Sequence, residues 1–90
     1  MIKIKEKDLN KVFKDFKNKD IIIEFENGIF GKIKFEKADI IYDEEIGFIN
    51  IINKKNKLRI NTTTTYGYMM AEEGNTVKIR VDCRIQFKNQ

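Results

Sequence analysis

The chain contains no histidine, no proline and no tryptophan, and only one cysteine, Cys83. Without histidine, the sequence lacks the commonest general base and the commonest zinc ligand of proteins. Cys83 has no imidazole to activate it and lies in an alternating apolar pattern, so we expect a small core residue rather than a nucleophile. The five glycines form no phosphate-binding motif. These absences predict a protein that is not an enzyme and that uses no cofactor or metal.

Long apolar runs are also missing. No stretch approaches the roughly 18 residues of a membrane-spanning helix, and the opening residues, MIKIKEKDLNK, lack the apolar core of a secretory signal. A single cysteine forms no intramolecular disulfide, so nothing requires an oxidising compartment. We therefore expect a cytoplasmic protein without membrane contact. A chain of 90 residues suffices for one hydrophobic core, which predicts a single domain over residues 1–90.

Charge is distributed unevenly around the net value of +4. Residues 1–20 carry a net charge of +3, residues 21–53 carry −4, and residues 54–90 carry +5. The middle of the chain is therefore acidic and both ends are basic. This arrangement suits a partner of mixed charge, or it produces one basic face if the two ends meet in the folded protein.

Four apolar residues near the N-terminus recur at the i, i+3, i+4, i+7 spacing that places side chains in one stripe of a helix. They are Leu9, Val12, Phe13 and Phe16. Asp8 is suited to cap the first turn. The pattern predicts an amphipathic helix over about residues 8–18, preceded by a short edge strand at residues 2–5.

From Ile21 onward, apolar residues alternate with polar ones at the period of two that is typical of β-strands. The longest alternation runs from Val77 to Phe87. Polar segments at residues 43–45, 53–56 and 72–75 have the composition of turns. The pattern predicts strands at about residues 21–26, 29–36, 38–42, 47–53, 57–66 and 76–87.

The Asn27-Gly28 pair marks a hairpin between the first two of these strands. A three-residue loop, with Gly28 in the left-handed conformation, keeps apolar residues opposite one another better than a two-residue loop does. The expected pairs are Phe25 with Ile29, Ile23 with Gly31 and Ile21 with Ile33.

Together these elements predict an α+β, mainly β fold, in which an N-terminal amphipathic helix precedes a five- to six-stranded antiparallel meander. The meander forms a small barrel or a strongly curved sheet. Over residues 8–39, the order of helix, strand, Asn-Gly turn and glycine-containing second strand resembles the Sm-like small barrels that assemble into RNA-binding rings. In that family the glycine of the second strand lies five residues after the turn glycine, whereas Gly31 lies three residues after Gly28. The family's second motif is missing from the latter half of the chain. The resemblance therefore extends to small-barrel architecture and not to membership.

The segment INTTTTYGYMM, residues 60–70, continues the alternation of the strand that begins near Lys57. Because β-branched residues favour strands, we expect four of its side chains on one face. They are Thr62, Thr64, Tyr66 and Tyr68. That face is either a sheet surface cross-bonded by hydroxyls or a ligand surface, where hydroxyls meet phosphate and tyrosines stack on bases. A short helix over residues 66–73 is a third interpretation, which Gly67 in its first turn disfavours.

Seven basic residues in the second half of the chain form the clearest candidate binding surface. They are Lys54, Lys55, Lys57, Arg59, Lys78, Arg80 and Arg84. If the strands that begin near residues 57 and 76 are neighbours, these residues form one basic face with the tyrosines beside it, as in proteins that bind single-stranded nucleic acids. Outward lysines and arginines on strands also serve solubility and oppose aggregation at sheet edges.

Small size, missing catalytic chemistry and segregated charge favour a non-enzymatic cytoplasmic binding protein, with another protein as the expected partner. Lysine outnumbers arginine fifteen to three, which indicates an AT-rich coding genome such as that of a low-GC bacterium or its phages. An inhibitor of a host defence protein, carried by a phage or mobile element, is one concrete form. The alternatives are a protein that binds nucleic acid or a nucleotide through the basic face, and a structural homo-oligomer subunit that pairs strand edges.

Overall fold

A computed structural model describes residues 1–14, 16–26 and 31–83, without the side chains of Glu26, Thr64, Tyr66 and Cys83. Within this part the protein is mainly β, with seven strands in one mixed sheet and one short α-helix. The strands are β1 (Ile2–Ile4), β2 (Lys19–Glu26), β3 (Gly31–Asp43), β4 (Phe48–Ile52), β5 (Lys57–Asn61), β6 (Thr65–Glu73) and β7 (Thr76–Cys83). The helical segments are α1 (Leu9–Phe13) and the 3₁₀-helices η1 (Glu6–Asp8) and η2 (Thr62–Thr64).

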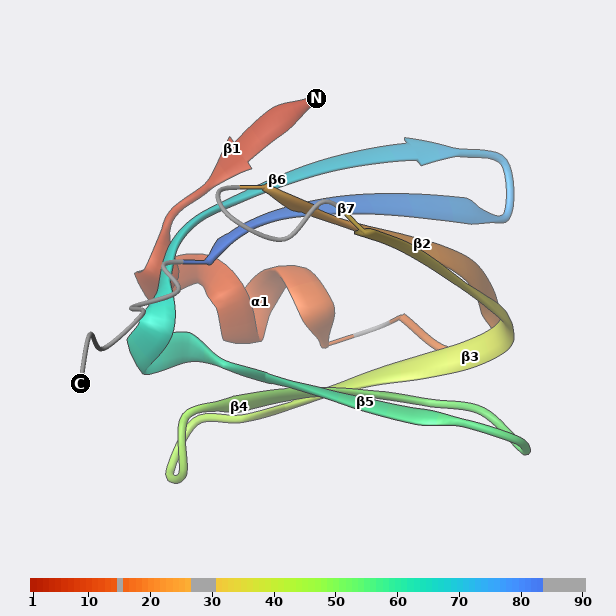
Figure 1. The fold of residues 1–90 in the computed structure, drawn as a ribbon, viewed down its shortest axis with the longest axis horizontal. Helices are drawn as coiled ribbons and strands as arrows, with labels where there is room; N and C mark the ends of the chain where they lie inside the picture. Colours follow the sequence, from red (N-terminus) through yellow and green to blue (C-terminus); the bar gives the residue numbers. More distant parts are fainter. Residues whose placement is uncertain (15, 27–30, 84–90) are drawn as a thin grey trace, which may run out of the picture.

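The strand order is β1-β6-β7-β2-β3-β4-β5. The prediction of a purely antiparallel meander is wrong, because β7 lies between β6 and β2 and pairs with β2 in parallel. Figure 1 shows the sheet curving around α1, with β1, β6, β7 and β2 on one side of the helix and β4 and β5 on the other. Among the described residues no pairing joins β1 to β5, so the curved sheet is open rather than closed into a barrel.

A bulge in β3 lies where the sequence pattern predicted a break between two strands. The register with β2 shifts between Lys19 and Ile21, so that Glu36 and Lys37 both lie opposite Asp20. Lys37 has a left-handed φ of 47°, and its backbone N–H donates a hydrogen bond to Asp20 Oδ1 at 3.2 Å. A bulge bends and twists its strand. β3 therefore continues for thirteen residues while it turns from one side of the helix to the other (Figure 1).

The helix is shorter than the expected range of 8–18. α1 has five residues, and Asp8 makes no side-chain capping bond. Phe16 follows the helix, yet it is as much a part of the core as Phe13, with 7% and 1% of their surfaces exposed. The Phe16 carbonyl accepts a hydrogen bond from the backbone N–H of Ile40 in β3 at 2.9 Å. The chain thus leaves the helical conformation where a bond to the sheet becomes available.

One apolar cluster fills the space inside the curve. Its buried members come from every strand and from the helical segment: Ile4, Leu9, Phe13, Phe16, Ile21, Ile23, Phe35, Ala38, Ile40, Ile49, Ile51, Ile60, Tyr68, Val77, Ile79 and Val81. The alternation in the sequence predicted most of these inward positions, because the period of two assigns residues to faces whichever strand lies next to them.

The predicted register of the first hairpin is wrong by two residues. β2 and β3 pair Phe25 with Gly31, Ile23 with Ile33 and Ile21 with Phe35. A shift of two residues leaves every side chain on its expected face, so the inward set of β2 is unchanged while its partners differ. The loop residues 27–30 lie outside the described residues.

The strand expected over residues 57–66 is interrupted by η2. Asn61 ends β5, and its Oδ1 accepts a hydrogen bond from the Thr63 backbone N–H at 3.0 Å. Thr62 is 5% exposed, and both its N–H and its hydroxyl donate to the Gly47 carbonyl at 2.8 Å. Thr62 therefore attaches η2 to the turn between β3 and β4. The chain then enters β6, which lies beside the edge strand β1 at the opposite end of the sheet from β5. Of the turn expected at residues 72–75, Gly74 and Asn75 join β6 to β7, whereas residues 72 and 73 belong to β6.

Replacing Thr62 by Val should lower the free energy of unfolding by about 1 kcal/mol, the usual net contribution of a hydrogen bond. For a domain of this size, the thermal midpoint should fall by about 4–8 °C. The matched control is Thr63→Val, because the exposed Thr63 hydroxyl bonds to Asn61 and to no other group among the described residues. Gly47→Ala should cost more than Thr62→Val, because Gly47 has a φ of +73° and an added Cβ would lie 3.0 Å from Thr62 Oγ1. Equal midpoints for the wild type and Thr62→Val would contradict this role of Thr62.

Candidate functional site

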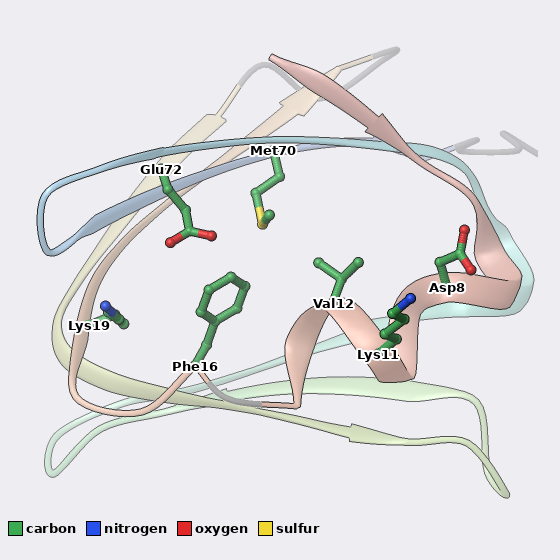
Figure 2. Close-up of a pocket in the computed structure, with 7 residues that line it drawn as sticks. All are labelled: Asp8, Lys11, Val12, Phe16, Lys19, Met70 and Glu72. Carbon is green, nitrogen blue, oxygen red and sulfur yellow. The ribbon is translucent and has the colours of Figure 1, made fainter.

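A groove opens between the helical segment and the inner side of β6 (Figure 2). Its floor is apolar, and Figure 2 shows Met70 descending from β6 toward Val12 and Phe16. The groove has a volume of about 670 Å³. We call it the helix groove, and it is lined by Asp8, Lys11, Val12, Phe16, Lys19, Met70 and Glu72.

Charges of both signs border the helix groove. Asp8 and Lys11 come from the helical segment, Lys19 from β2 and Glu72 from β6. Within the part of the chain that the structure describes, none of these four side chains makes an ion pair. The groove can therefore receive an apolar group on its floor while its rim meets both cations and anions.

Sequence patterns identified only half of this groove. The stripe of the helix correctly predicted that Val12 and Phe16 face inward. The other wall was predicted only in part, because the alternation through residues 60–70 was assigned to a continuation of β5 and not to the separate strand β6. The signal was nevertheless present in Tyr68 and Met70, which alternate with outward residues and, respectively, pack in the core and against it.

On the outer face of the sheet, the Glu24 carboxylate lies among three cations from two neighbouring strands. The Nζ of Lys78 is 2.9 Å from Glu24 Oε1, and the Nζ of Lys32 is 3.6 Å from the same oxygen. Arg80 donates to Oε2 through Nη2 at 3.3 Å and through Nε at 3.4 Å. The Glu24 side chain is only 19% exposed. This arrangement follows from the pairing of Glu24 with Arg80 on one side and with Lys32 on the other.

The surrounding cations lower the pKa of Glu24 below its ordinary value of 4.5. The hydrogen bond from Lys78 is the main cause, desolvation opposes it, and the bond from Arg80 adds to the lowering. Because the pKa of the folded protein is below that of the unfolded chain, the stabilisation is complete above the unfolded value. It is lost as the pH falls through the folded value.

Glu24→Gln should therefore be less stable than the wild type at pH 7, and the difference should shrink as the pH falls below about 4.5. Urea unfolding of both proteins between pH 7 and pH 3 measures it. Glu44→Gln is the control, because Glu44 is exposed in a turn and makes no ion pair within the described residues. A Glu24→Gln difference that is constant across this pH range would show that the cations do not act on the carboxylate.

The predicted basic face is divided between two distant parts of the sheet. Lys78 and Arg80 lie on β7, whereas Lys57 and Arg59 lie on the edge strand β5, with β2, β3 and β4 between them. β5 and β7 are therefore not neighbours, as the prediction of one basic face required. The guanidinium of Arg59 lies over the ring of Phe48, 4.2 Å from its centroid. Arg84 lies outside the described residues.

Lys54 and Lys55 belong to a second depression, outside the bend of β3. It has a volume of about 760 Å³. We call it the lysine hollow, and it is lined by Asn18, Lys34, Glu36, Lys37, Asn53, Lys54, Lys55 and Asn56. The sequence predicted Lys54 and Lys55 as binding residues, but their association with Lys34 and Lys37 depends on how β3 and the β4–β5 turn meet in space.

Two residues of the predicted threonine and tyrosine face are buried and stabilise the fold. Tyr68 is 3% exposed in the core, and Thr62 is 5% exposed and bonded to Gly47. The side chains of Thr64 and Tyr66 lie outside the described part of the chain. Thr62 and Tyr68 thus present no surface for base stacking or phosphate contact in this conformation.

Comparison of the chain with protein-family models, with curated proteins and with solved structures finds no match in any of the three. No helix among the described residues is long and apolar enough to cross a membrane. Those residues also contain no group of three or more side chains arranged to hold a metal ion.

Proposed function

We propose that this protein is a non-enzymatic cytoplasmic binding protein that acts by occupying a surface of another protein. The observation that carries the proposal is the helix groove, with its apolar floor and its rim of two cations and two carboxylates. Protein interfaces commonly have this organisation, in which an apolar centre receives an anchor side chain and a polar rim surrounds it.

The chemistry of the groove indicates which partner surface it accepts. Val12, Phe16 and Met70 favour an aliphatic or aromatic side chain that leaves water on binding. Lys11 and Glu72, both exposed, favour charges of opposite sign on the partner segment that carries this anchor. We infer a segment with an apolar residue between an acidic and a basic residue.

An inhibitor of a host defence protein, carried by a phage or mobile element, is the concrete form that we favour. It fits a small chain that acts by covering a surface rather than by catalysis, and it fits the lysine-rich composition of an AT-rich genome. Such an inhibitor requires only a specific interface and a fold that holds it in place.

The test uses reversal of the rim charges in the double variant Lys11→Glu/Glu72→Lys. Affinity capture from a low-GC bacterial lysate, followed by mass spectrometry, should recover a stoichiometric protein with the wild type and lose it with this variant. With the purified partner, titration calorimetry should show binding weakened by about tenfold or more, because two attractive contacts become repulsive.

The matched control is Lys14→Glu/Glu73→Lys, which makes the same two charge changes at exposed positions outside the groove. It should bind the partner like the wild type, and both variants should keep the wild-type thermal midpoint. Recovery of no stoichiometric protein, or equal loss of binding in both double variants, would refute the proposed role of the groove.

A further inference from the structure

Positive charge is concentrated in the lysine hollow. Of its eight described lining residues, four are lysines and one, Glu36, is acidic. Within the described residues, none of Lys34, Lys37, Lys54 and Lys55 makes an ion pair. Like charges gathered in a depression raise the local potential and attract an anion.

The Glu24 cluster shows the opposite arrangement on the same sheet. There, Lys32, Lys78 and Arg80 surround one carboxylate at 2.9 to 3.6 Å. Each of these cations thus has a counter-charge beside it, although one carboxylate offsets only part of the three positive charges. Of the basic residues that the sequence marked as candidates, Lys54, Lys55, Lys57 and Arg59 make no ion pair among the described residues. Lys54 and Lys55 are the two of these that line the hollow, whereas Lys78 and Arg80 of β7 share the Glu24 carboxylate.

Local backbone interactions hold the walls of the lysine hollow in place. Asn53 Oδ1 accepts the backbone N–H groups of Lys55 at 2.9 Å and Asn56 at 2.7 Å, which fixes the turn that carries Lys54. Asn53 Nδ2 donates to the Glu36 carbonyl at 3.2 Å. The turn is thus attached to the bulge of β3, and the lysines of both walls face one space.

Besides Glu36, two further carboxylates near this bend accept hydrogen bonds from the backbone. Asp20 Oδ1 accepts the N–H of Lys37 at 3.2 Å, and Asp39 Oδ1 accepts the N–H of Asn18 at 2.8 Å. Both donors have left-handed φ values, 47° for Lys37 and 54° for Asn18. A lysine is an uncommon residue at such a position, where glycine costs less. Here the strained position carries one of the four cations.

We propose that the lysine hollow binds the sugar–phosphate backbone of a nucleic acid. Four ammonium groups around one depression require a ligand with several closely spaced negative charges. A nucleic-acid duplex carries one charge per about 1.7 Å of its axis, whereas an extended acidic peptide carries at most one per about 3.3 Å. Lysine binds phosphate as a point charge, and the exposed Asn18 and Asn56 side chains add neutral hydrogen-bond donors.

The residues that line the hollow also determine whether it can recognise a base sequence. Its described lining contains no aromatic side chain and no arginine, so bases have no ring on which to stack and no planar fork that recognises a base edge. Binding through this site is therefore independent of sequence. The helix groove lies on the inner side of the sheet, so the two sites serve different ligands.

The test measures binding of a fluorescently labelled 20-base-pair DNA duplex, and of one of its strands, by anisotropy over a range of salt concentrations. The logarithm of the binding constant should fall linearly with the logarithm of the salt concentration, because binding releases counterions. Lys54→Ala/Lys55→Ala should bind about tenfold to thirtyfold more weakly at low salt, and its slope should be smaller in magnitude by about 2.

Lys37→Gly is a second variant, and it should fold at least as stably as the wild type. Removing the left-handed lysine should raise the thermal midpoint by about 4 °C, while its salt slope decreases in magnitude by about 1. The matched control is Lys7→Ala/Lys14→Ala, which removes two exposed lysines outside both depressions. The control should keep nearly the wild-type affinity, and so separates the hollow from a general effect of net charge.

Three results would overturn the assignment. The first is no binding of either oligonucleotide by the wild type at low salt. The second is an equal loss of affinity in Lys54→Ala/Lys55→Ala and in Lys7→Ala/Lys14→Ala. The third is binding to poly-glutamate of equal total charge that is as tight as binding to DNA, which would indicate a site for acidic peptides.

Discussion

The parallel ladder between β2 and β7 is the interaction on which the other features of this fold depend. It aligns Ile21 with Val77, Ile23 with Ile79 and Phe25 with Val81, so that the inward apolar side chains of the two strands lie side by side over the core. Because β7 fills the place beside β2, β6 is carried one position outward, where it receives β1 as the edge strand. The same ladder places Arg80 beside Glu24 and so produces the charge cluster on the outer face.

The curvature of the sheet is the second feature on which the two sites depend, because it gives the sheet an inner and an outer side. The bulge at Lys37 turns β3, and Thr62 fixes the turn between β3 and β4 to η2. On the inner side, the curve encloses the helix and leaves the helix groove between α1 and β6 (Figure 2). On the outer side, the same bend brings the β4–β5 turn against β3 and forms the lysine hollow. An apolar site and a cationic site thus arise from one feature of the backbone.

Pairing of charges decides which cations are available for binding. A cation beside a carboxylate at hydrogen-bond distance loses much of its attraction for an external anion, as with Lys78 and Glu24 at 2.9 Å. Lysines in the hollow have no such counter-charge among the described residues. A count of basic residues along the chain does not distinguish these cases, because the neutralising residue lies on another strand.

The sequence by itself determined the faces of the elements. The helical spacing that ends in Phe16 and the alternation from Val77 both identified core residues correctly, because these patterns repeat within a single segment. Only the tertiary structure decided which strands are neighbours. A period of two is the same for a parallel and an antiparallel partner, and a two-residue shift preserves it, as the pairing of Ile21 with Phe35 shows. The interruption at Thr62 was likewise decided by a hydrogen bond to Gly47, fifteen residues away. Interactions over such separations depend on the packing of the whole core, which no local pattern records.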